Sequence, residues 1–283
     1  MINPDRHIEV MGIINLTDDS YYSPSRNLKD GYIDTDGVLA TVGRMVSEGA
    51  EIIDFGACSS RPGAVPLSWE GEWRRLELVV ASFLVKCPGV RFSIDTWHSQ
   101  VVSRVYDMAV ALVGCEEVRK LMIVNDISAG EDDGDMLPLV GRLGLRYIAM
   151  HKRGSSENMR DFCTYDDVVS EVKAYFEDFA RKAEEYGISD WILDPGFGFA
   201  KTLEQNYQLL KGLSELSGCG QISILAGVSR KSTIYRYLGI TPEESLPATQ
   251  VLHLKALQEG ADMLRVHDVA EAVRTVALYR VLR

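Results

Sequence analysis

Residues 191–201, WILDPGFGFAK, contain the pattern that decides the fold. The stretch begins with an apolar run at 191–193, which is typical of a buried strand. The acidic Asp194 follows directly, and the next six residues, PGFGFA, cannot continue a strand or form an ordinary helix. Lys201 comes next, and Thr202 after it is a good N-cap for a helix. The pattern therefore predicts a buried strand, a carboxylate at its carboxyl end, a glycine-rich turn and a helix.

Eight short apolar runs along the chain are predicted to be buried strands, each followed by a helix. They are continuous rather than alternating, as expected for a parallel sheet that is buried on both faces. The predicted strands span residues 8–14, 51–56, 90–95, 121–124, 146–150, 191–193, 222–227 and 261–266. Helices are predicted at 36–49, 69–86, 96–108, 135–143, 166–187, 203–214, 247–259 and 267–283, with another starting at 229–232. Eight strand–helix units in 283 residues favour a single-domain α/β fold, a (β/α)8 TIM barrel, over a doubly wound sheet.

The composition limits the classes of function. Hydrophobic residues make up 46% of the chain, enough for a sizeable core, and the net charge of −11 opposes nonspecific binding to nucleic acid or an anionic membrane. No apolar run is close to the length of about 20 residues that a membrane helix needs. The first ten residues lack the basic segment followed by an apolar segment that is typical of a signal peptide. The five cysteines are scattered without a CxxC pair, so reduced thiols in a cytoplasmic protein are the simplest account and structural zinc is not expected.

Polar side chains follow almost all of the predicted strands, at the end that forms the catalytic face of such a barrel. They are Asn15, Asp54, Asp95, Asn125, Asp126, His151, Asp194, Ser229, Arg230, Lys231, Arg265 and His267. Buried charges need partners, and these side chains converge on one mouth. Those that we expect to be functional are Asp95, Asn125, Asp194, Lys231 and Arg265.

Three of the strand-end residues have plainer alternatives. Asp54 and Asp126 are interpreted as loop caps or as acceptors that support the functional side chains. His151 is equally well interpreted as an ordinary, partly buried histidine.

The candidate residues divide into two chemical groups. Asp95, Asn125 and Asp194 offer acceptors that suit a flat nitrogen heterocycle with amidine-like N–H groups. The second group consists of donors near helix starts that suit a phosphate or pyrophosphate: Arg61, Lys231, Arg265 and His267. Asn15 fits a Mg²⁺ ion that arrives with the pyrophosphate, because Mg²⁺ often takes one protein ligand plus phosphate oxygens and water.

Taken in order, these motifs resemble those of the dihydropteroate synthase family. The resemblance extends from Met11 to about Leu278. The matching segments are MGIINLT at 11–17 with DS at 19–20, SSRPG at 59–63, SIDT at 93–96, NDI at 125–127, MH at 150–151, DPGFGF at 194–199 with KT at 201–202, GVSRKS at 227–232 and RVHDV at 265–269. One such segment would be weak, but all of them in order are specific.

The resemblance implies the condensation of 6-hydroxymethyl-7,8-dihydropterin pyrophosphate with p-aminobenzoate, giving dihydropteroate and pyrophosphate. It places the pterin against Asp95, Asn125, Asp194 and Lys231, with Met150, Phe199 and Gly227 lining its slot. It places the pyrophosphate against Ser60, Arg61, Arg265 and His267 and the Mg²⁺ cofactor on Asn15, and it counts Val266 among the substrate-binding residues. It places the p-aminobenzoate near Ser229, Arg61 and Pro62.

The implied mechanism agrees with the chemistry of the residues. The cations, Lys231 and Arg265 among them, and Mg²⁺ would stabilise the departing pyrophosphate. Asp95 and Asp194 would stabilise the positive charge that develops on the pterin methylene as the C–O bond breaks. The arylamine is a weak nucleophile, but it is already neutral, so positioning can suffice without a general base. A homodimer formed through the last helices is expected from the resemblance alone.

The sequence departs from the family pattern mainly in its first two loops. Asp18 stands where proline is usual, and YYSP at 21–24 replaces a Phe-Ser-Asp-like run. Cys58 stands for glutamate and Ser60 for threonine; Ala200 replaces a glycine and Lys152 a usually uncharged residue. The changes in the first loop and at Cys58 bear on p-aminobenzoate affinity and on the response to sulfonamides.

Two other functions fit parts of the pattern. A pterin-binding methyltransferase barrel acting on methyltetrahydrofolate shares the acidic pterin pocket but needs no pyrophosphate cradle, so the SRKS and RVH segments count against it. A paralogue that binds pterin without turnover is the second alternative, because function depends on the site and not on the fold.

Overall fold

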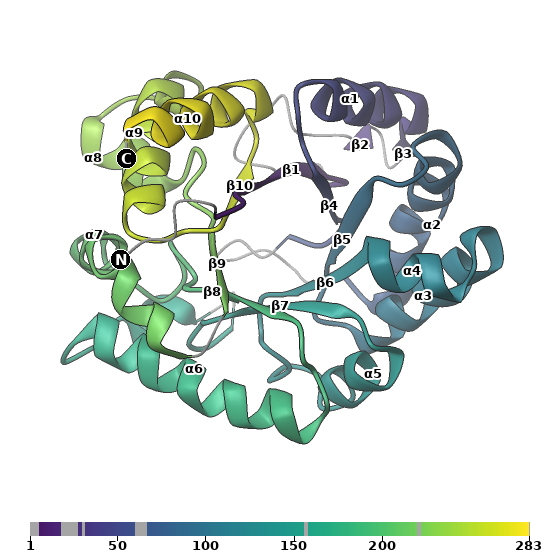
Figure 1. The fold of residues 1–283 in the computed structure, drawn as a ribbon, viewed down its shortest axis with the longest axis horizontal. Helices are drawn as coiled ribbons and strands as arrows, with labels where there is room; N and C mark the ends of the chain where they lie inside the picture. Colours follow the sequence, from purple (N-terminus) through teal and green to yellow (C-terminus); the bar gives the residue numbers. More distant parts are fainter. Residues whose placement is uncertain are drawn as a thin grey trace.

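Eight parallel strands close into a barrel in the computed structural model, which describes residues 6–17, 28–29, 32–59, 67–155, 158–219 and 222–282 (Figure 1). Each strand pairs with the next along the chain, and the last pairs with the first. The barrel strands are β1 (Glu9–Asn15), β4 (Ile52–Gly56), β5 (Arg91–Asp95), β6 (Met122–Asp126), β7 (Arg146–Met150), β8 (Trp191–Asp194), β9 (Ser223–Ala226) and β10 (Met263–Val266). The predicted (β/α)8 TIM barrel is confirmed.

Helices connect successive strands on the outside of the barrel. They are α1 (Thr35–Ser47), α2 (Trp69–Lys86), α3 (Ser99–Val113), α4 (Cys115–Leu121), α5 (Met136–Leu143), α6 (Val168–Glu185), α7 (Leu203–Lys211), α8 (Ser232–Leu238), α9 (Leu246–Gln258) and α10 (Val269–Leu282). The predicted N-cap at Thr202 is confirmed: its hydroxyl accepts from the backbone N–H of Gln205, whose side chain bonds back to Thr202 N.

Three differences from the sequence prediction are the clearest. Helix α3 continues beyond the predicted end near 108 until Gly114, whose φ of 89° lies in the left-handed region. The seven-residue helix α4 was not predicted, because so short a segment carries little periodicity. Two short strands, β2 (Leu28–Lys29) and β3 (Tyr32–Ile33), also form an unpredicted antiparallel pair before α1.

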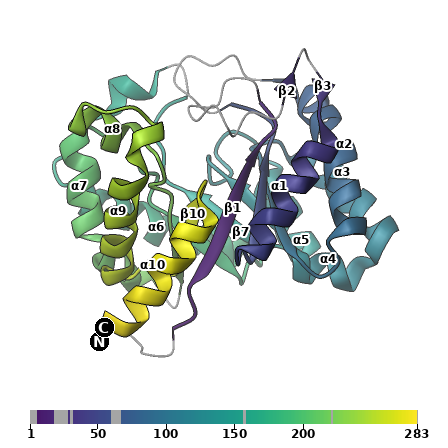
Figure 2. The same cartoon turned by 90° about the horizontal axis from the view of Figure 1, so that it is seen from above.

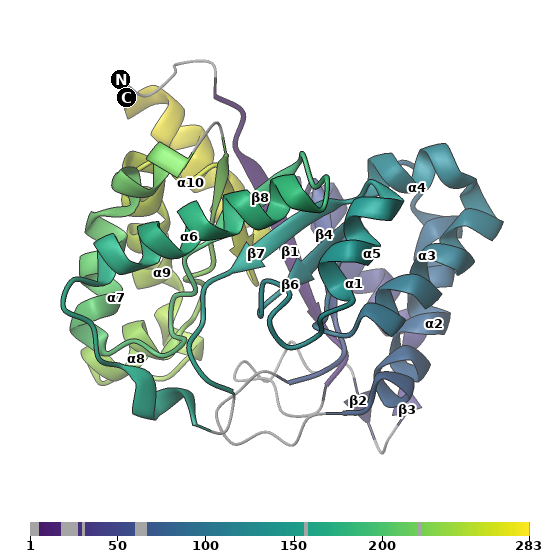
Figure 3. The same cartoon turned by 90° about the horizontal axis from the view of Figure 1, so that it is seen from below.

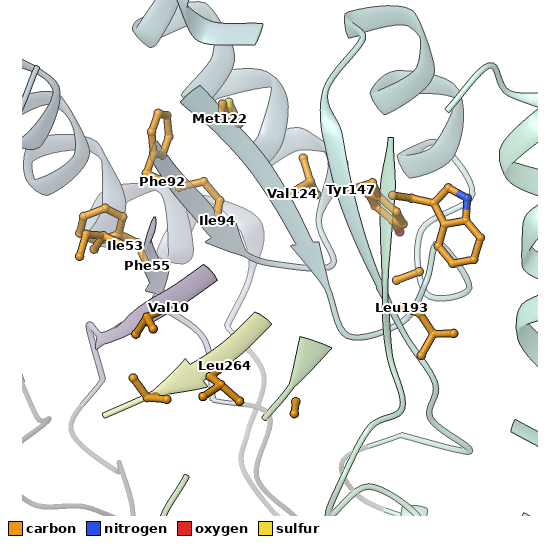
Figure 4. Close-up of a cluster of buried hydrophobic side chains, with 14 of the residues drawn as sticks. Val10, Ile53, Phe55, Phe92, Ile94, Met122, Val124, Tyr147, Leu193 and Leu264 are labelled. Atoms are coloured by element: carbon orange, nitrogen blue, oxygen red, sulfur yellow. The ribbon is translucent and has the colours of Figure 1, made fainter. Parts of the chain in front are cut away.

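Alternate residues of each strand face opposite sides of the barrel wall. One set packs under the helices, as Figure 4 shows for Val10, Ile53, Phe55, Phe92, Ile94, Met122, Val124, Tyr147, Leu193 and Leu264. The other set fills the barrel interior with Met11, Ile52, Ile123, Ile148, Ile192, Leu225 and Met263. Both sets are apolar, which explains why the strands are continuous apolar runs.

An ionic cluster closes the amino-terminal end of the barrel. Glu9, at the start of β1, is largely buried and bonds to Arg91 and, at 3.1 Å, to Arg146. Figure 2 shows the start of β1 at the same end of the molecule as the last turn of α10. The carboxyl ends of the strands lie at the opposite end.

The long helix α6 lies across β7 and β8 on the outside of the barrel (Figure 3). Aromatic side chains hold it there. Phe179 stacks on Tyr147 of β7 at 5.9 Å between ring centroids and meets Trp191 of β8 edge-on at 4.8 Å. Such pairs add to the stabilisation from burial. The packing therefore holds in place two strands whose carboxyl ends carry candidate site residues.

Candidate active site at the carboxyl end of the barrel

Strand alternation turns most of the predicted residues toward the barrel axis. In β4, Asp54 lies two residues beyond the interior Ile52; in β6, Asn125 lies two residues beyond the interior Ile123. The same step of two leads from interior residues to Asp194 in β8 and to Arg265 in β10. Pairing places Asn15 opposite Gly56, Gly56 opposite Asp95, and Asp95 opposite Asn125. One row of neighbouring strand ends therefore carries Asn15, Asp95 and Asn125.

Arg265 joins two of these carboxylates. Its Nε lies 2.7 Å from Oδ2 of Asp54, and its Nη2 lies 2.6 Å from Oδ2 of Asp95. Burial disfavours the arginine cation, but the two aspartates outweigh this effect and raise the pKa of Arg265. The guanidinium is therefore a permanent positive charge at the barrel mouth.

The amide of Asn125 is oriented by Asp54. Its Nδ2 donates to Oδ1 of Asp54 at 3.2 Å and reaches Oδ2 at 3.4 Å. An ionised carboxylate only accepts hydrogen bonds, so the amide nitrogen must be the atom that faces Asp54. Asn125 is consequently left with its Oδ1 as the acceptor for other groups.

The glycine-rich turn after β8 is built around Asp194. The backbone N–H of Gly196 donates to Asp194 Oδ1 at 2.8 Å. Gly196 has a φ of 69°, and a Cβ at this position would lie 2.0 Å from the carbonyl oxygen of His151, so only glycine fits. Beyond it, the carbonyl of Phe197 accepts from Nζ of Lys231, and the same Nζ lies 5.1 Å from the ring centroid of Phe199. The turn thus brings Lys231 to Asp194.

A second lysine lies under this turn. Lys201 is buried, and its Nζ lies 3.0 Å from Nδ1 of His151 and within 3.1 Å of the carbonyl oxygens of Gly196 and Phe199. Burial, with help from Lys201, lowers the pKa of His151 to about 2, so its ring is neutral and accepts at Nδ1. This matches the plainer interpretation of His151. The role of Lys201 was missed from the sequence, although a lysine next to a glycine-rich turn was the available signal.

The electrostatic balance of the site moves several pKa values toward neutrality. Burial raises the pKa of Asp95 to about 7, against the opposing effect of Arg265. Burial also raises the pKa of Asp194 and lowers that of Lys231 to about 8, in spite of their mutual attraction. Burial and Arg265 lower the pKa of His267 to about 4. Clusters of such groups are typical of functional sites.

The remaining predicted residues are placed less uniformly. Met150 is buried opposite Asp194, and the hydroxyl of Ser229 accepts from the backbone N–H of His267 at 3.2 Å. A Cβ at Gly227 would lie 3.9 Å from Nζ of Lys231. The Val266 side chain belongs to the core under the helices, so only its backbone can face the barrel mouth. Ser60, Arg61 and Pro62, together with Asp18 and residues 21–24, lie outside the described residues.

Two charged strand-end residues serve the scaffold. Asp126 faces the helix side, where it accepts from the backbone and hydroxyl of Ser128, from Gly130 N and from the hydroxyl of Tyr147. This confirms its interpretation as a loop cap. The guanidinium of Arg230 pairs with both oxygens of Asp268, at 2.7 and 2.9 Å, and is buried by this pairing.

Asn15 is the candidate metal ligand at this end of the barrel. Within the described part of the chain, one set of three His, Cys, Asp or Glu side chains has all its ligand atoms within 4.8 Å of one another. It consists of His7, Glu9 and Glu51, at the opposite end of the barrel. An amide oxygen is a ligand that Mg²⁺ accepts, but one amide cannot complete its coordination. The donor set therefore fits a Mg²⁺ ion that brings phosphate oxygens and water with it.

Comparison with known proteins places the chain in a family. A family model described as pterin binding enzyme matches residues 11–267. The dihydropteroate synthase of Escherichia coli strain K12 is 35% identical over 272 residues, which cover 95% of this chain and 90% of that protein. The dihydropteroate synthase of Mycobacterium leprae strain TN is 34% identical over 275 residues, covering 94% and 90%.

Solved structures agree with this placement. A Yersinia pestis dihydropteroate synthase in complex with a sulfonamide drug superposes with a TM-score of 0.87 at 31% identity, covering 100% of this chain and 96% of that one. A Xanthomonas albilineans dihydropteroate synthase with 4-aminobenzoic acid gives a TM-score of 0.82 at 33% identity, covering 99% and 94%. The chain therefore belongs to the dihydropteroate synthase family, the pterin-binding transferases of folate biosynthesis.

Proposed function

We propose that the chain condenses 6-hydroxymethyl-7,8-dihydropterin pyrophosphate with p-aminobenzoate at the carboxyl end of the barrel. The observation that carries this proposal is the close approach of acceptors and cations there. Arg265 bonds to Asp95, and Lys231 interacts with Asp194 across the glycine turn. The acceptors suit a heterocycle with several N–H groups, and the cations suit its pyrophosphate.

The acceptors hold the pterin ring. Asn125 offers its Oδ1, because its nitrogen is engaged by Asp54, and Asp95 and Asp194 offer carboxylate oxygens for charge-assisted hydrogen bonds. The buried Met150 and the neighbouring Phe199 and Gly227 line the slot for the ring. The carboxylates also stabilise the positive charge that develops on the pterin methylene as its C–O bond breaks.

The cations receive the departing pyrophosphate. Arg265 keeps its charge at all relevant pH values, and Lys231 is held in place by the carbonyl of Phe197. A Mg²⁺ ion held by Asn15 would supply further neutralisation of the pyrophosphate charge. The neutral arylamine then attacks the methylene from the side of Ser229 as the C–O bond to pyrophosphate breaks, and the proton that its nitrogen loses passes to the solvent; the protein contributes orientation rather than a base.

The two alternatives make different predictions. A methyltransferase acting on methyltetrahydrofolate does not need a group of cations for pyrophosphate, and the Escherichia coli and Mycobacterium leprae proteins to which this chain is similar are dihydropteroate synthases. A non-catalytic pterin-binding paralogue would keep the acceptors but not the turnover. The atypical residues Asp18 and Cys58, on the p-aminobenzoate side by resemblance, are the reason to test turnover directly.

The experiment is to incubate the purified protein with the pterin pyrophosphate and Mg²⁺, with and without p-aminobenzoate, and to follow dihydropteroate and pyrophosphate together. Equal release of both products, dependent on p-aminobenzoate, supports the synthase. Asp95→Ala and Lys231→Ala should each lower kcat/KM by orders of magnitude. Tight pterin binding without dihydropteroate would instead identify a binding paralogue, and near-native kinetics in both variants would overturn the site assignment.

We also propose that the enzyme works as a cytoplasmic homodimer. No helix in the described part of the chain is long and apolar enough to cross a membrane. The cysteines whose state is described are free thiols, which suits a reducing compartment. Helices α9 and α10 pack against each other and both carry exposed apolar side chains, which supports a second copy as their partner: Val251, Leu278, Val281 and Leu282.

A further inference from the structure

Asp54 is the most heavily bonded carboxylate inside the barrel. It is completely buried, and both of its oxygens accept hydrogen bonds. Oδ1 accepts from the hydroxyl of Ser93 and from Nδ2 of Asn125, and Oδ2 accepts from Arg265 through Nε at 2.7 Å and Nη2 at 2.5 Å. Asp54 lies deeper in the barrel than Asp95. It pairs with Ser93, two residues before Asp95 in β5, whereas Asp95 pairs with Gly56.

We propose that Asp54 is a positioning residue, which sets the orientation of Asn125 and Arg265 for the pterin and the pyrophosphate. This inference rests on the proposed function of the site. Asp54 does not itself face the substrate, since its lone pairs are occupied by protein donors. It acts through two side chains that do.

The first consequence concerns the direction of the Asn125 amide. A carboxylate offers no hydrogen, so it accepts only the –NH₂ of Asn125 and leaves the carbonyl oxygen for a substrate N–H. An amide in place of Asp54 would offer both a donor and an acceptor. Asn125 could then turn over and present a donor where the pterin also has donors. The negative charge of Asp54 therefore specifies an acceptor at Asn125.

The second consequence concerns the division of Arg265 between two carboxylates. Asp54 holds the Nε side of the guanidinium, while Nη2 also reaches Asp95. As long as Asp54 holds Arg265, Asp95 can turn to a substrate N–H without releasing the cation. Without the charge of Asp54, Arg265 would rely on Asp95 alone and would compete with the substrate for it. Both halves of the substrate would then bind less tightly.

Asp126 provides a matched control for this role. It is also completely buried and also accepts four hydrogen bonds, from Ser128 N and Oγ at 2.7 Å, Gly130 N at 2.8 Å and Tyr147 Oη at 2.6 Å. It belongs to a barrel strand as well, but it faces the helices rather than the axis. Its replacement removes hydrogen bonds of the scaffold but none of those that orient Asn125 or Arg265.

The test compares Asp54→Asn with Asp126→Asn. For each folded variant, kcat/KM is measured for the pterin pyrophosphate, and the Kd of inorganic pyrophosphate with Mg²⁺ is measured by calorimetry. Residues that orient metal ligands typically contribute about 10- to 100-fold to affinity or activity, and we apply the same scale to Asp54. We expect Asp54→Asn to lose about that much in kcat/KM and to bind pyrophosphate about tenfold less tightly. Asp126→Asn should lower Tm but keep both constants within about twofold of the wild type, as expected for a residue that orients no binding group.

Equal effects of the two variants on the pyrophosphate Kd would overturn the inference. If Asp54→Asn does not fold, the same comparison uses Ser93→Ala and Ser128→Ala, which remove one donor from Asp54 and Asp126 respectively. Only the Ser93 variant should then weaken pyrophosphate binding, and equal weakening would again overturn the inference. Because the calorimetry needs no turnover, a wild type that forms no dihydropteroate would refute the proposed function without deciding this comparison.

Discussion

The ammonium of Lys201 lies 3.0 Å from Nδ1 of His151, and both side chains are buried behind the glycine turn. The same nitrogen donates to the carbonyl oxygens of Gly196 and Phe199 at 3.0 and 3.1 Å. Burial lowers the pKa of Lys201 to about 7, and its protonated form carries three N–H bonds, which the three surrounding acceptors use in full. Lys201 therefore ties the turn after β8 to the end of β7.

Replacing Lys201 by methionine should destabilise the protein by about 2–4 kcal/mol, because three buried acceptors lose their donor. Urea unfolding at neutral pH measures the change. Lys211→Met, on the exposed last turn of α7, is the control and should stay within about 0.5 kcal/mol of the wild type. A Lys201 variant as stable as the Lys211 variant would show that the turn does not depend on this ammonium.

The pH dependence of kcat/KM should follow two groups of the site. Asp95, with a pKa raised to about 7, becomes negative only as the pH rises through that value. Lys231, with a pKa lowered to about 8, loses its charge as the pH rises further. Activity should therefore be highest between about 7 and 8 and fall on both sides, since kcat/KM reports the free enzyme.

Lys231→Arg identifies the alkaline limb of that profile. Arginine stays protonated, so the variant should lose the decline above pH 8 even if its maximal rate is lower. The acid limb should be unchanged. An alkaline limb that persists in Lys231→Arg would assign it to another group.

Removal of Mg²⁺ should abolish turnover with the pterin pyrophosphate, and Asn15 should determine how much metal is required. Asn15→Ala removes the one amide oxygen at the end of β1. We expect the Mg²⁺ concentration for half-maximal rate to rise about tenfold, while the Kd of a pterin without phosphates stays the same. A parallel loss of pterin affinity would show that Asn15 contacts the ring instead of the metal.

The architecture could be predicted because each strand end is marked twice, by an apolar run and by a polar residue after it. It was harder to predict how deep each side chain lies in the barrel and whether it faces the axis or the helices. Asp54 and Asp95 both end an apolar run, yet Asp54 lies one step deeper in the barrel, and strand boundaries read from sequence are uncertain by more than that step. Asn125 and Asp126 are neighbours, so only one can face the axis, and it is Asn125, the one expected to be functional.

The supporting contacts depend on packing between distant segments and therefore left no local pattern. His151 meets Lys201 across fifty positions of sequence, and Arg265 meets Asp54 across more than two hundred. His151, Asp54 and Arg265 were recognised as polar strand ends, but their partners were not. What the sequence could supply was the type of each group and the end of the barrel at which it lies.

The dimer proposal predicts that charge on α10 will separate the subunits. Leu278 and Val281 are 63% and 81% exposed. Leu278→Glu with Val281→Glu should convert a dimer to a monomer in light scattering, because charged groups are unfavourable in the core of such an interface. Leu78→Glu is the control: Leu78 is also 63% exposed, but it lies on α2, which α1 separates from α10 around the barrel (Figure 1). A wild type that is monomeric would refute the proposal outright.

Acid should destabilise the protein through His253, which lies away from the site on α9. Its ring is fully buried, and burial lowers its pKa to about 4 from an ordinary value of 6.5. Between these values the unfolded chain binds a proton that the folded protein does not, so stability falls as the pH drops from about 6.5 to about 4. The loss approaches about 1.4 kcal/mol per pH unit within that window.

A substitution at His253 isolates this effect from the other buried groups. His253→Leu removes the titrating ring, so its stability relative to the wild type should improve steadily as the pH is lowered from 6.5 to 4. Urea midpoints at half-unit pH intervals measure the difference, which should be constant above pH 7. The hydrogen bond between Nδ1 and Gln250, at 3.2 Å, is lost at every pH and only shifts the whole curve. A difference that does not vary with pH would mean that His253 is protonated as readily in the folded protein as in the unfolded chain.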